Sequence, residues 1–236
     1  MEAMAHATNP NRAGARPLFR CAWRDVMFLH YEADPAALRP LVPFELDLHK
    51  GKAYVSVVTI TIRPVGFRAS APLLAAQSFL NVRTYVKGGI FFLAGWVPNP
   101  LGALLGPRFV GIPYRFGRLA LDRDVTELHG RCSAAAGTFE VRASIDPRQA
   151  YRRPATGTLE EFLLERYAAF TRSGRRKLSF RTWHGPWTYV DIEPEIESDR
   201  LLRASGPWYR RARLVAAHHS PGFDSVWMGR LEKVKP

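Results

Sequence analysis

Runs of β-branched and aromatic residues, separated by turn residues, recur along this chain and restrict its fold more than any other feature of the sequence. Residues 53–62, AYVSVVTITI, are apolar at both alternating positions, which is typical of a strand covered on both faces. Residues 78–86, SFLNVRTYV, alternate more openly, and Lys87-Gly88-Gly89 then turns the chain into a second run, IFFLAGWV. The pattern predicts an α+β fold dominated by antiparallel strands.

Other segments of the sequence predict either further strands or helices. Asp34-Pro35, directly after the strand-like residues 22–31, predicts a helix N-cap with proline at the first helical position. Thr158 and Glu161 form a capping box, and apolar residues at helical spacing continue as far as Phe170. We therefore expect one long helix from Thr158 that ends near Ser173-Gly174. Further strands are predicted at residues 127–134, 138–145, 178–184, 186–192 and 224–231.

The 236 residues, 47% of them apolar, suffice for one β-rich domain, which we expect at residues 17–236. Residues 1–16 lack the apolar segment of a secretory signal and predict a disordered tail. The most apolar window, residues 88–106, is interrupted by prolines, so no membrane span is predicted. Cys21 and Cys132 fit neither a disulfide framework nor a metal site. By elimination, the sequence indicates a cytoplasmic protein.

The net charge of +13 comes from 28 Arg and 6 Lys, a bias that a GC-rich genome produces without functional cause. The distribution of charge is more informative, because no Asp or Glu occurs between Asp47 and Asp122. Any pocket that this acid-free stretch builds would favour anions. The basic residues inside it are Lys50, Lys52, Arg63, Arg68, Arg83, Lys87, Arg108, Arg115 and Arg118.

Several kinds of active site leave no motif in this sequence. There is no Gly-x-Ser-x-Gly elbow and no phosphate-binding glycine loop. The seven histidines show neither His-x-His nor His-Glu-x-x-His spacing, so we predict no metal site and no cofactor, although a site assembled from separate strands would leave no such spacing. Residues 208–213, WYRRAR, are the best candidate for nucleic-acid binding, but they are more typical of an ordinary edge strand.

Five segments together resemble the uncharacterised YqjF-like family, known as domain of unknown function 2071, over about residues 21–229. That family is similar in fold to acetoacetate decarboxylase. The resemblance implies a mainly antiparallel β-barrel or cone with a few helices and an interior cavity, and it makes a homo-oligomer an expectation. The segments are WRDVMFLHYEADPAALRPLVP, SFLNVRTYV, GIPYR, LEEFLLERY and WHGPW.

The resemblance also suggests which part of the decarboxylase site this chain retains. Those enzymes use a lysine, with its pKa lowered by a second lysine and by burial, to form an imine with a β-keto acid. Tyr114 and Arg115 stand where the two lysines would be, and Phe79 and Ser56 stand where two glutamates would be. Arg24 matches the arginine that the decarboxylases keep. The resemblance thus implies that carboxylate binding persists and that imine chemistry is absent.

We therefore expect a cavity that binds a small anionic or carbonyl-containing molecule. Tyr114 is the candidate catalytic residue, since a nearby cation would lower its pKa. The expected ligand-binding residues are Arg24, Arg83, Tyr85 and Arg115, since a guanidinium fork can hold a carboxylate.

Three of these candidate residues could have a structural role instead of a functional one. In that case the Tyr114 ring would pack on the core, the Arg115 guanidinium would be solvated, and Arg83 would be buried and paired with Tyr85 or a backbone carbonyl. His184 and Trp187 fit a structural turn better than a site. Three functions stay open: an enzyme using lyase-like or acid–base chemistry on a small organic acid, a non-enzymatic binder of small molecules, and a nucleic-acid or polyanion binder.

Overall fold

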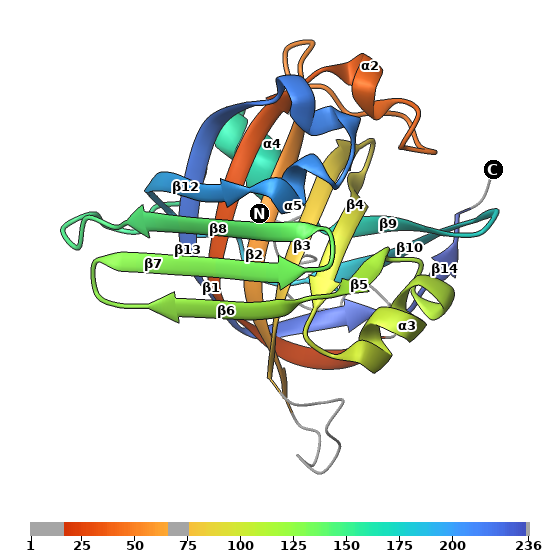
Figure 1. Ribbon diagram of the computed structural model, residues 1–236, viewed down its shortest axis with the longest axis horizontal. Helices are drawn as coiled ribbons and strands as arrows, with labels where there is room; N and C mark the ends of the chain where they lie inside the picture. The colour runs from red at the N-terminus through yellow and green to blue at the C-terminus, as the bar shows by residue number, and fades with distance from the viewer. Residues whose placement is uncertain (1–16, 66–75, 235–236) are drawn as a thin grey trace.

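The computed structural model describes residues 17–65 and 76–234, and the tail predicted at residues 1–16 lies outside them. Most of the described residues belong to two mainly antiparallel β-sheets, with short helices at their edges (Figure 1). Among the described residues, no helix has both the length and the apolar composition to cross a bilayer. The expectation of a strand-dominated α+β fold is confirmed.

The larger sheet has ten strands and closes into a ring, because β13 pairs with β1 on one side and with β10 on the other. The order along the ring is β13-β1-β2-β3-β4-β9-β10, with β5, β11 and β14 added at its edges. Its strands are β1 (Pro17–Ala33), β2 (Ala53–Val65), β3 (Gln77–Val86), β4 (Gly89–Val97), β5 (Tyr114–Phe116), β9 (Ala168–Ser173), β10 (Arg176–Trp183), β11 (Val190–Asp191), β13 (Arg213–Gly229) and β14 (Glu232–Lys233).

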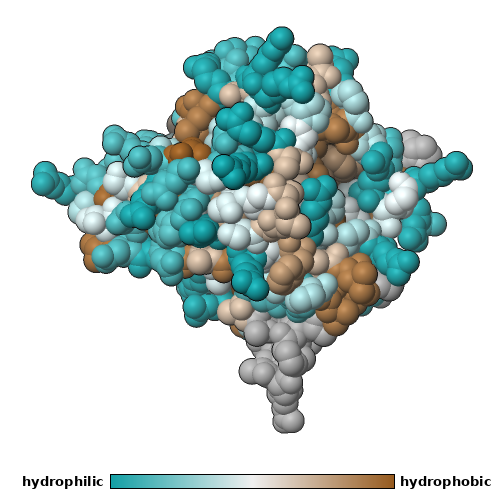
Figure 2. All heavy atoms as spheres, viewed as in Figure 1, coloured by the Kyte–Doolittle hydropathy of each residue, from teal (hydrophilic) through white to brown (hydrophobic). Residues whose placement is uncertain are grey.

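The smaller sheet lies across the outer faces of β1, β2 and β3 (Figure 1). Val55 and Val57 of β2 belong to the core between the two sheets, whereas Val58 and Ile60 belong to a cluster inside the ring. This arrangement explains why residues 53–62 are apolar on both faces. Figure 2 shows mainly hydrophilic atoms on the exposed face of the smaller sheet. Its strands, in sheet order, are β12 (Glu193–Asp199), β8 (Gly137–Ser144), β7 (Glu127–Ala134) and β6 (Arg118–Arg123).

The helices are short and sit at the ends of strands. The carboxylate of Asp34 accepts a hydrogen bond from the Ala36 amide at 2.8 Å, which confirms the predicted N-cap. Helix α3 (Pro100–Phe109) is not predicted from the sequence. The Asn99 side chain caps this helix by accepting hydrogen bonds from the amides of Leu101 and Gly102, and Pro100 is at the first helical position. The helical segments are α2 (Pro35–Leu38), α3 (Pro100–Phe109), α4 (Leu159–Leu164), α5 (Arg200–Arg203) and the 3₁₀ turn η2 (Pro207–Arg211).

The long helix predicted from Thr158 to Ser173 is wrong in its length. The Thr158 hydroxyl does accept from the Glu161 amide at 3.3 Å, but the helix ends at Leu164. Residues 168–173 form strand β9, and Gly174, with φ of +60°, turns the chain into β10. Parallel pairing of β9 with β4 and antiparallel pairing with β10 stabilise the strand. Tertiary pairing has therefore overridden a local helical pattern.

Candidate functional site

A cavity of about 110 Å³ lies inside the ring, lined mainly by the inner faces of the strands and partly by loop residues. Most of its wall is apolar, with Phe28, Ile60 and Trp187 among the larger contributors. A volume of this size holds several water molecules or one small organic molecule. The polar side chains in the wall are Trp23, Asn81, Arg83, Tyr114, Arg166 and Thr182.

Arg83 is the feature that sets the electrostatics of the cavity. Its guanidinium carbon lies 5.5 Å from the ring centroid of Phe28, and its Nε is buried without a hydrogen-bond partner. No Asp or Glu among the described residues forms an ion pair with it. Burial lowers the pKa of Arg83, although the nearby Tyr85 hydroxyl opposes that effect. An arginine is nevertheless protonated at neutral pH, so the wall carries an uncompensated positive charge.

The second guanidinium in the wall has its own partners. Arg166 donates to a carboxylate oxygen of Asp47 at 2.8 Å and, through Nε, to the carbonyl of Phe162 at 2.7 Å. Its guanidinium carbon also lies 4.2 Å from the ring centroid of Phe162. Arg166 therefore adds less net charge to the cavity than Arg83 does.

Tyr114 lies in a slot formed by two glycines. A Cβ atom at Gly95 of β4 would lie 2.8 Å from the Tyr114 ring, and one at Gly106 of α3 would lie 2.6 Å from it. Only residues without a side chain leave room for the ring on both sides. No described residue forms a hydrogen bond with the Tyr114 hydroxyl, although the side chain lines the cavity. Burial raises the pKa of Tyr114. The expected fall in this pKa is wrong, since no cation among the described residues offsets desolvation, and the Tyr114 hydroxyl keeps its proton at neutral pH.

Two more wall residues carry polar atoms without partners. The indole Nε1 of Trp23 and the side-chain oxygen of Asn81 are both buried and unpaired. Buried polar groups in folded proteins are nearly always hydrogen-bonded, so these atoms mark positions where a bound molecule can supply a partner. Both come from strands that the sequence predicted, and Asn81 shares its face with Arg83 by period two. Their unpaired state could not be read from the sequence.

Arg24 and Arg115 lie outside the cavity, contrary to expectation. Arg24 is ion-paired with Asp224 and its side chain is 38% exposed, while Arg115 is exposed on β5. Successive residues of a strand point to opposite faces. Because Trp23 and Tyr114 face the cavity, the residues that follow them cannot.

Tyr85 faces the ring interior but does not belong to the cavity wall. Its hydroxyl lies 2.5 Å from Ser56 Oγ and donates to the carbonyl of Leu163 at 3.0 Å. The acid-free stretch contributes fewer cations to the cavity than expected, because Arg83 alone among its described basic residues lines the wall. Arg68 lies outside the described residues, and the other seven are exposed.

The tight turn after β10 contributes one wall residue. Trp187 lines the cavity, and its backbone amide donates to Glu165 at 2.9 Å. His184 packs against Trp23 and Trp187 and donates through Nδ1 to the carbonyl of Gly185 at 2.6 Å. The structural role expected for His184 agrees with this packing.

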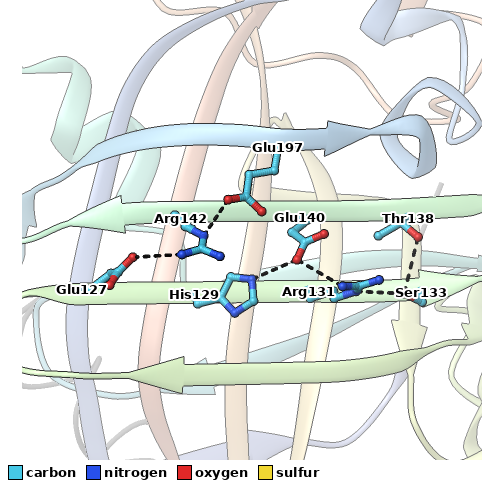
Figure 3. Close-up of polar contacts among 8 residues, drawn as sticks. All are labelled: Glu127, His129, Arg131, Ser133, Thr138, Glu140, Arg142 and Glu197. Carbon is cyan, nitrogen blue, oxygen red and sulfur yellow. Dashed lines mark hydrogen bonds and ion pairs between the residues drawn. The ribbon is translucent and has the colours of Figure 1, made fainter.

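Figure 3 shows a second polar cluster, on the exposed face of the smaller sheet. His129, Glu140 and Glu197 present possible metal ligands within 4.8 Å of one another. Glu140, however, lies 3.3 Å from Arg131, and Glu197 lies 2.5 Å from Arg142. A cation would have to displace both arginines, so the cluster is best described as an ion-pair network.

A family described as an uncharacterized conserved protein, DUF2071, matches residues 20–224. The chain belongs to the DUF2071 family. This DUF2071 protein is 29% identical over 201 residues to uncharacterized protein YqjF of Bacillus subtilis (strain 168), an alignment that spans 80% of this chain and 82% of YqjF.

Comparison with solved structures identifies the fold of the DUF2071 chain. The enduracididine biosynthesis enzyme MppR complexed with pyruvate matches with a TM-score of 0.65 at 15% identity, covering 93% of this chain and 91% of MppR. Acetoacetate decarboxylase from Legionella pneumophila matches with a TM-score of 0.62 at 16% identity, covering 94% and 88%. An acetoacetate decarboxylase-like enzyme from Sphingomonas wittichii RW1 gives 0.60 at 16% identity, covering 94% of each chain. The DUF2071 chain therefore has an acetoacetate decarboxylase-like fold.

Proposed function

We propose that this protein binds a small carboxylate-bearing molecule in the cavity, with Arg83 as the partner of the carboxylate. The observation that carries the proposal is the buried guanidinium without an acidic partner among the described residues. An unpaired buried charge is costly, whereas a charge that is paired and hydrogen-bonded is not. A ligand carboxylate would supply the negative charge, and also an acceptor for the unpaired Nε, beside the hydrogen bond that Arg83 already has with Tyr85.

The rest of the wall specifies what the ligand carries besides its carboxylate. Trp23 Nε1 and the Tyr114 hydroxyl are donors, and together they suit a ligand carbonyl. The aliphatic and aromatic wall suits a short apolar body. MppR, which shares the fold, is a protein whose structure contains pyruvate, a molecule of this class. Pyruvate is therefore the first probe to test.

Imine chemistry is not part of the proposal. No lysine lines the cavity in the described part of the chain, and Tyr114 and Arg115 have no amine that could condense with a carbonyl. In this proposal the Tyr114 hydroxyl donates a hydrogen bond to a ligand carbonyl oxygen, which would polarise the carbonyl. Binding is common to the enzymatic and the non-enzymatic versions of this function, and turnover of the ligand separates them.

Thermal unfolding in the presence of pyruvate, acetate and isobutyrate tests the proposal. At a ligand concentration a hundred times Kd, stabilisation is about 2.7 kcal/mol, which for a domain of this size is a Tm increase of roughly 5–10 °C. Arg83→Gln should abolish the increase. The matched control is Arg118→Gln, because Arg118 is exposed on β6 and should leave the increase unchanged. Stabilisation that survives Arg83→Gln, or that depends on ionic strength alone, would contradict the proposal and favour a polyanion-binding surface.

A further inference from the structure

Two buried histidines, His30 of β1 and His218 of β13, lie side by side next to the cavity. Their ring centroids are 5.1 Å apart, and both side chains are almost completely buried. His30 Nδ1 lies 2.6 Å from Ser56 Oγ, and His218 Nε2 lies 3.4 Å from a carboxylate oxygen of Asp191. The other nitrogen of each ring, His30 Nε2 and His218 Nδ1, is buried without a partner. Each imidazole thus has one nitrogen in contact with a neighbour and one that is free to take a proton or a water molecule.

The strand register places His30 in line with Arg83, with Ser56 between them. His30 is directly opposite Ser56 in the β1–β2 ladder, and Ser56 is directly opposite Arg83 in the β2–β3 ladder. The three side chains therefore form a row across the inner face of the sheet. Phe28 fills the space beside the row: its ring stacks on His30 at 5.7 Å and lies 5.5 Å from the Arg83 guanidinium carbon. His30 is fully buried, so the charge of Arg83 acts on it more strongly than it would in solvent.

The pair also has a connection to the surface. The side chain of Asp191 is 54% exposed while it contacts His218. Two further residues lie on the solvent side of His218. Arg152 is ion-paired with Asp191, and the ring of Tyr189 lies 4.6 Å from the ring of His218. A proton can therefore pass between solvent and the histidine pair through Asp191 without crossing the cavity.

We propose that His30 and His218 form a proton-binding site coupled to the cavity, so that an anion bound at Arg83 is accompanied by one proton held between the two imidazoles. This inference rests on the proposed function. It adds that the site accepts its ligand as an anion together with a proton from solvent.

The charges around the pair determine the direction of the coupling. Burial, His218 and Arg83 together hold the pKa of His30 well below its usual value. Burial lowers the pKa of His218 to about 4, which Arg152 reinforces and which Asp191 and Glu160 oppose. Without a ligand both rings are therefore neutral at pH 7.

A bound carboxylate offsets Arg83 and so raises the pKa of the pair. The remaining neighbours of the pair, Ser56, Tyr85 and Tyr189, are neutral hydroxyl groups. Because the bound state has the higher pKa, protons are taken up on binding, and affinity increases as the pH falls.

Proton uptake can be measured directly in a pH-stat, by adding pyruvate to weakly buffered protein at the same pH. As the pH is lowered from 7 to 5, we expect the uptake per pyruvate bound to increase, with one proton as its upper limit, and Kd to fall by at most about tenfold per pH unit. His30→Gln and His218→Gln should remove the uptake. His129→Gln is the control, because His129 lies on the smaller sheet and pairs with Glu140.

A second measurement needs no ligand. Arg83→Gln removes the repelling charge permanently, so NMR titration should show a higher pKa for His30 or His218 in this variant than in the wild-type protein. Unchanged titration of both histidines would overturn the inference, as would pyruvate binding without proton uptake. Failure of every carboxylate to bind would instead contradict the proposed function, and the histidine titration would then decide the coupling by itself.

Discussion

The glycine slot around Tyr114 allows a quantitative test with one methyl group. In Gly95→Ala the new Cβ would lie 2.8 and 2.9 Å from two ring carbons of Tyr114, whereas non-bonded carbons prefer about 3.5–4.0 Å. The ring cannot retreat, because Gly106 of α3 lies against its other side. Overpacking of this kind costs about 1–3 kcal/mol, which for a domain of this size lowers Tm by roughly 2–12 °C.

A double-mutant cycle separates this effect from other consequences of the added methyl group. In a Tyr114→Ala background the ring is absent and the nearest contact left to the new Cβ is Asn81 Oδ1 at 3.2 Å, so Gly95→Ala should cost much less. The coupling energy between the two positions should be about 1–3 kcal/mol. Urea unfolding of the four proteins provides the measurement. Equal costs of Gly95→Ala in the two backgrounds would show that the slot does not hold the ring, and the assignment of Tyr114 as a positioned donor would be wrong.

Two further predictions concern protonation and covalent chemistry. Burial lowers the pKa of His184, His218 and His219 to about 4, so the unfolded chain binds more protons than the folded one between pH 6.5 and pH 4. Stability should therefore be fully present above pH 6.5 and decline as the pH falls towards 4; urea midpoints that stay constant from pH 7 to pH 5 would contradict this. Borohydride treatment in the presence of pyruvate or acetoacetate should leave the protein mass unchanged. A stable adduct on Lys50, Lys52 or Lys87 would show that another lysine forms the imine.

The strands could be predicted from the sequence because their signal is local. Period-two alternation in residues 78–86 placed Arg83, Tyr85 and Asn81 on one face, as the structure has them. The outward positions of two other predicted residues could not be obtained in this way.

Strict alternation would group Arg24 with Val26 and Phe28, which line the cavity, and only the irregular register that follows Arg24 turns its side chain outward. For Tyr114 and Arg115, alternation admits one of the two neighbours to the cavity and does not say which.

Other parts of the site depend on contacts that no local pattern records. Thr182 and Met228 reach the cavity because β10 and β13 pair and close the ring, and these two residues are themselves partners in that pairing. Residues 168–173 have helical spacing but form a strand between β4 and β10. The free nitrogen atoms of His30 and His218 likewise result from packing between strands that are far apart in the sequence.

The two faces of β1, β2 and β3 have different roles in the fold. The outward side chains of these strands, such as Leu29 and Val57, pack against the smaller sheet in a large apolar core, while the inward ones surround the cavity. Exchanging an inward residue therefore alters the lining of the cavity while leaving the packing between the sheets in place. The lining can accordingly change in small steps during evolution, and chains that share only 15% of their residues keep one architecture.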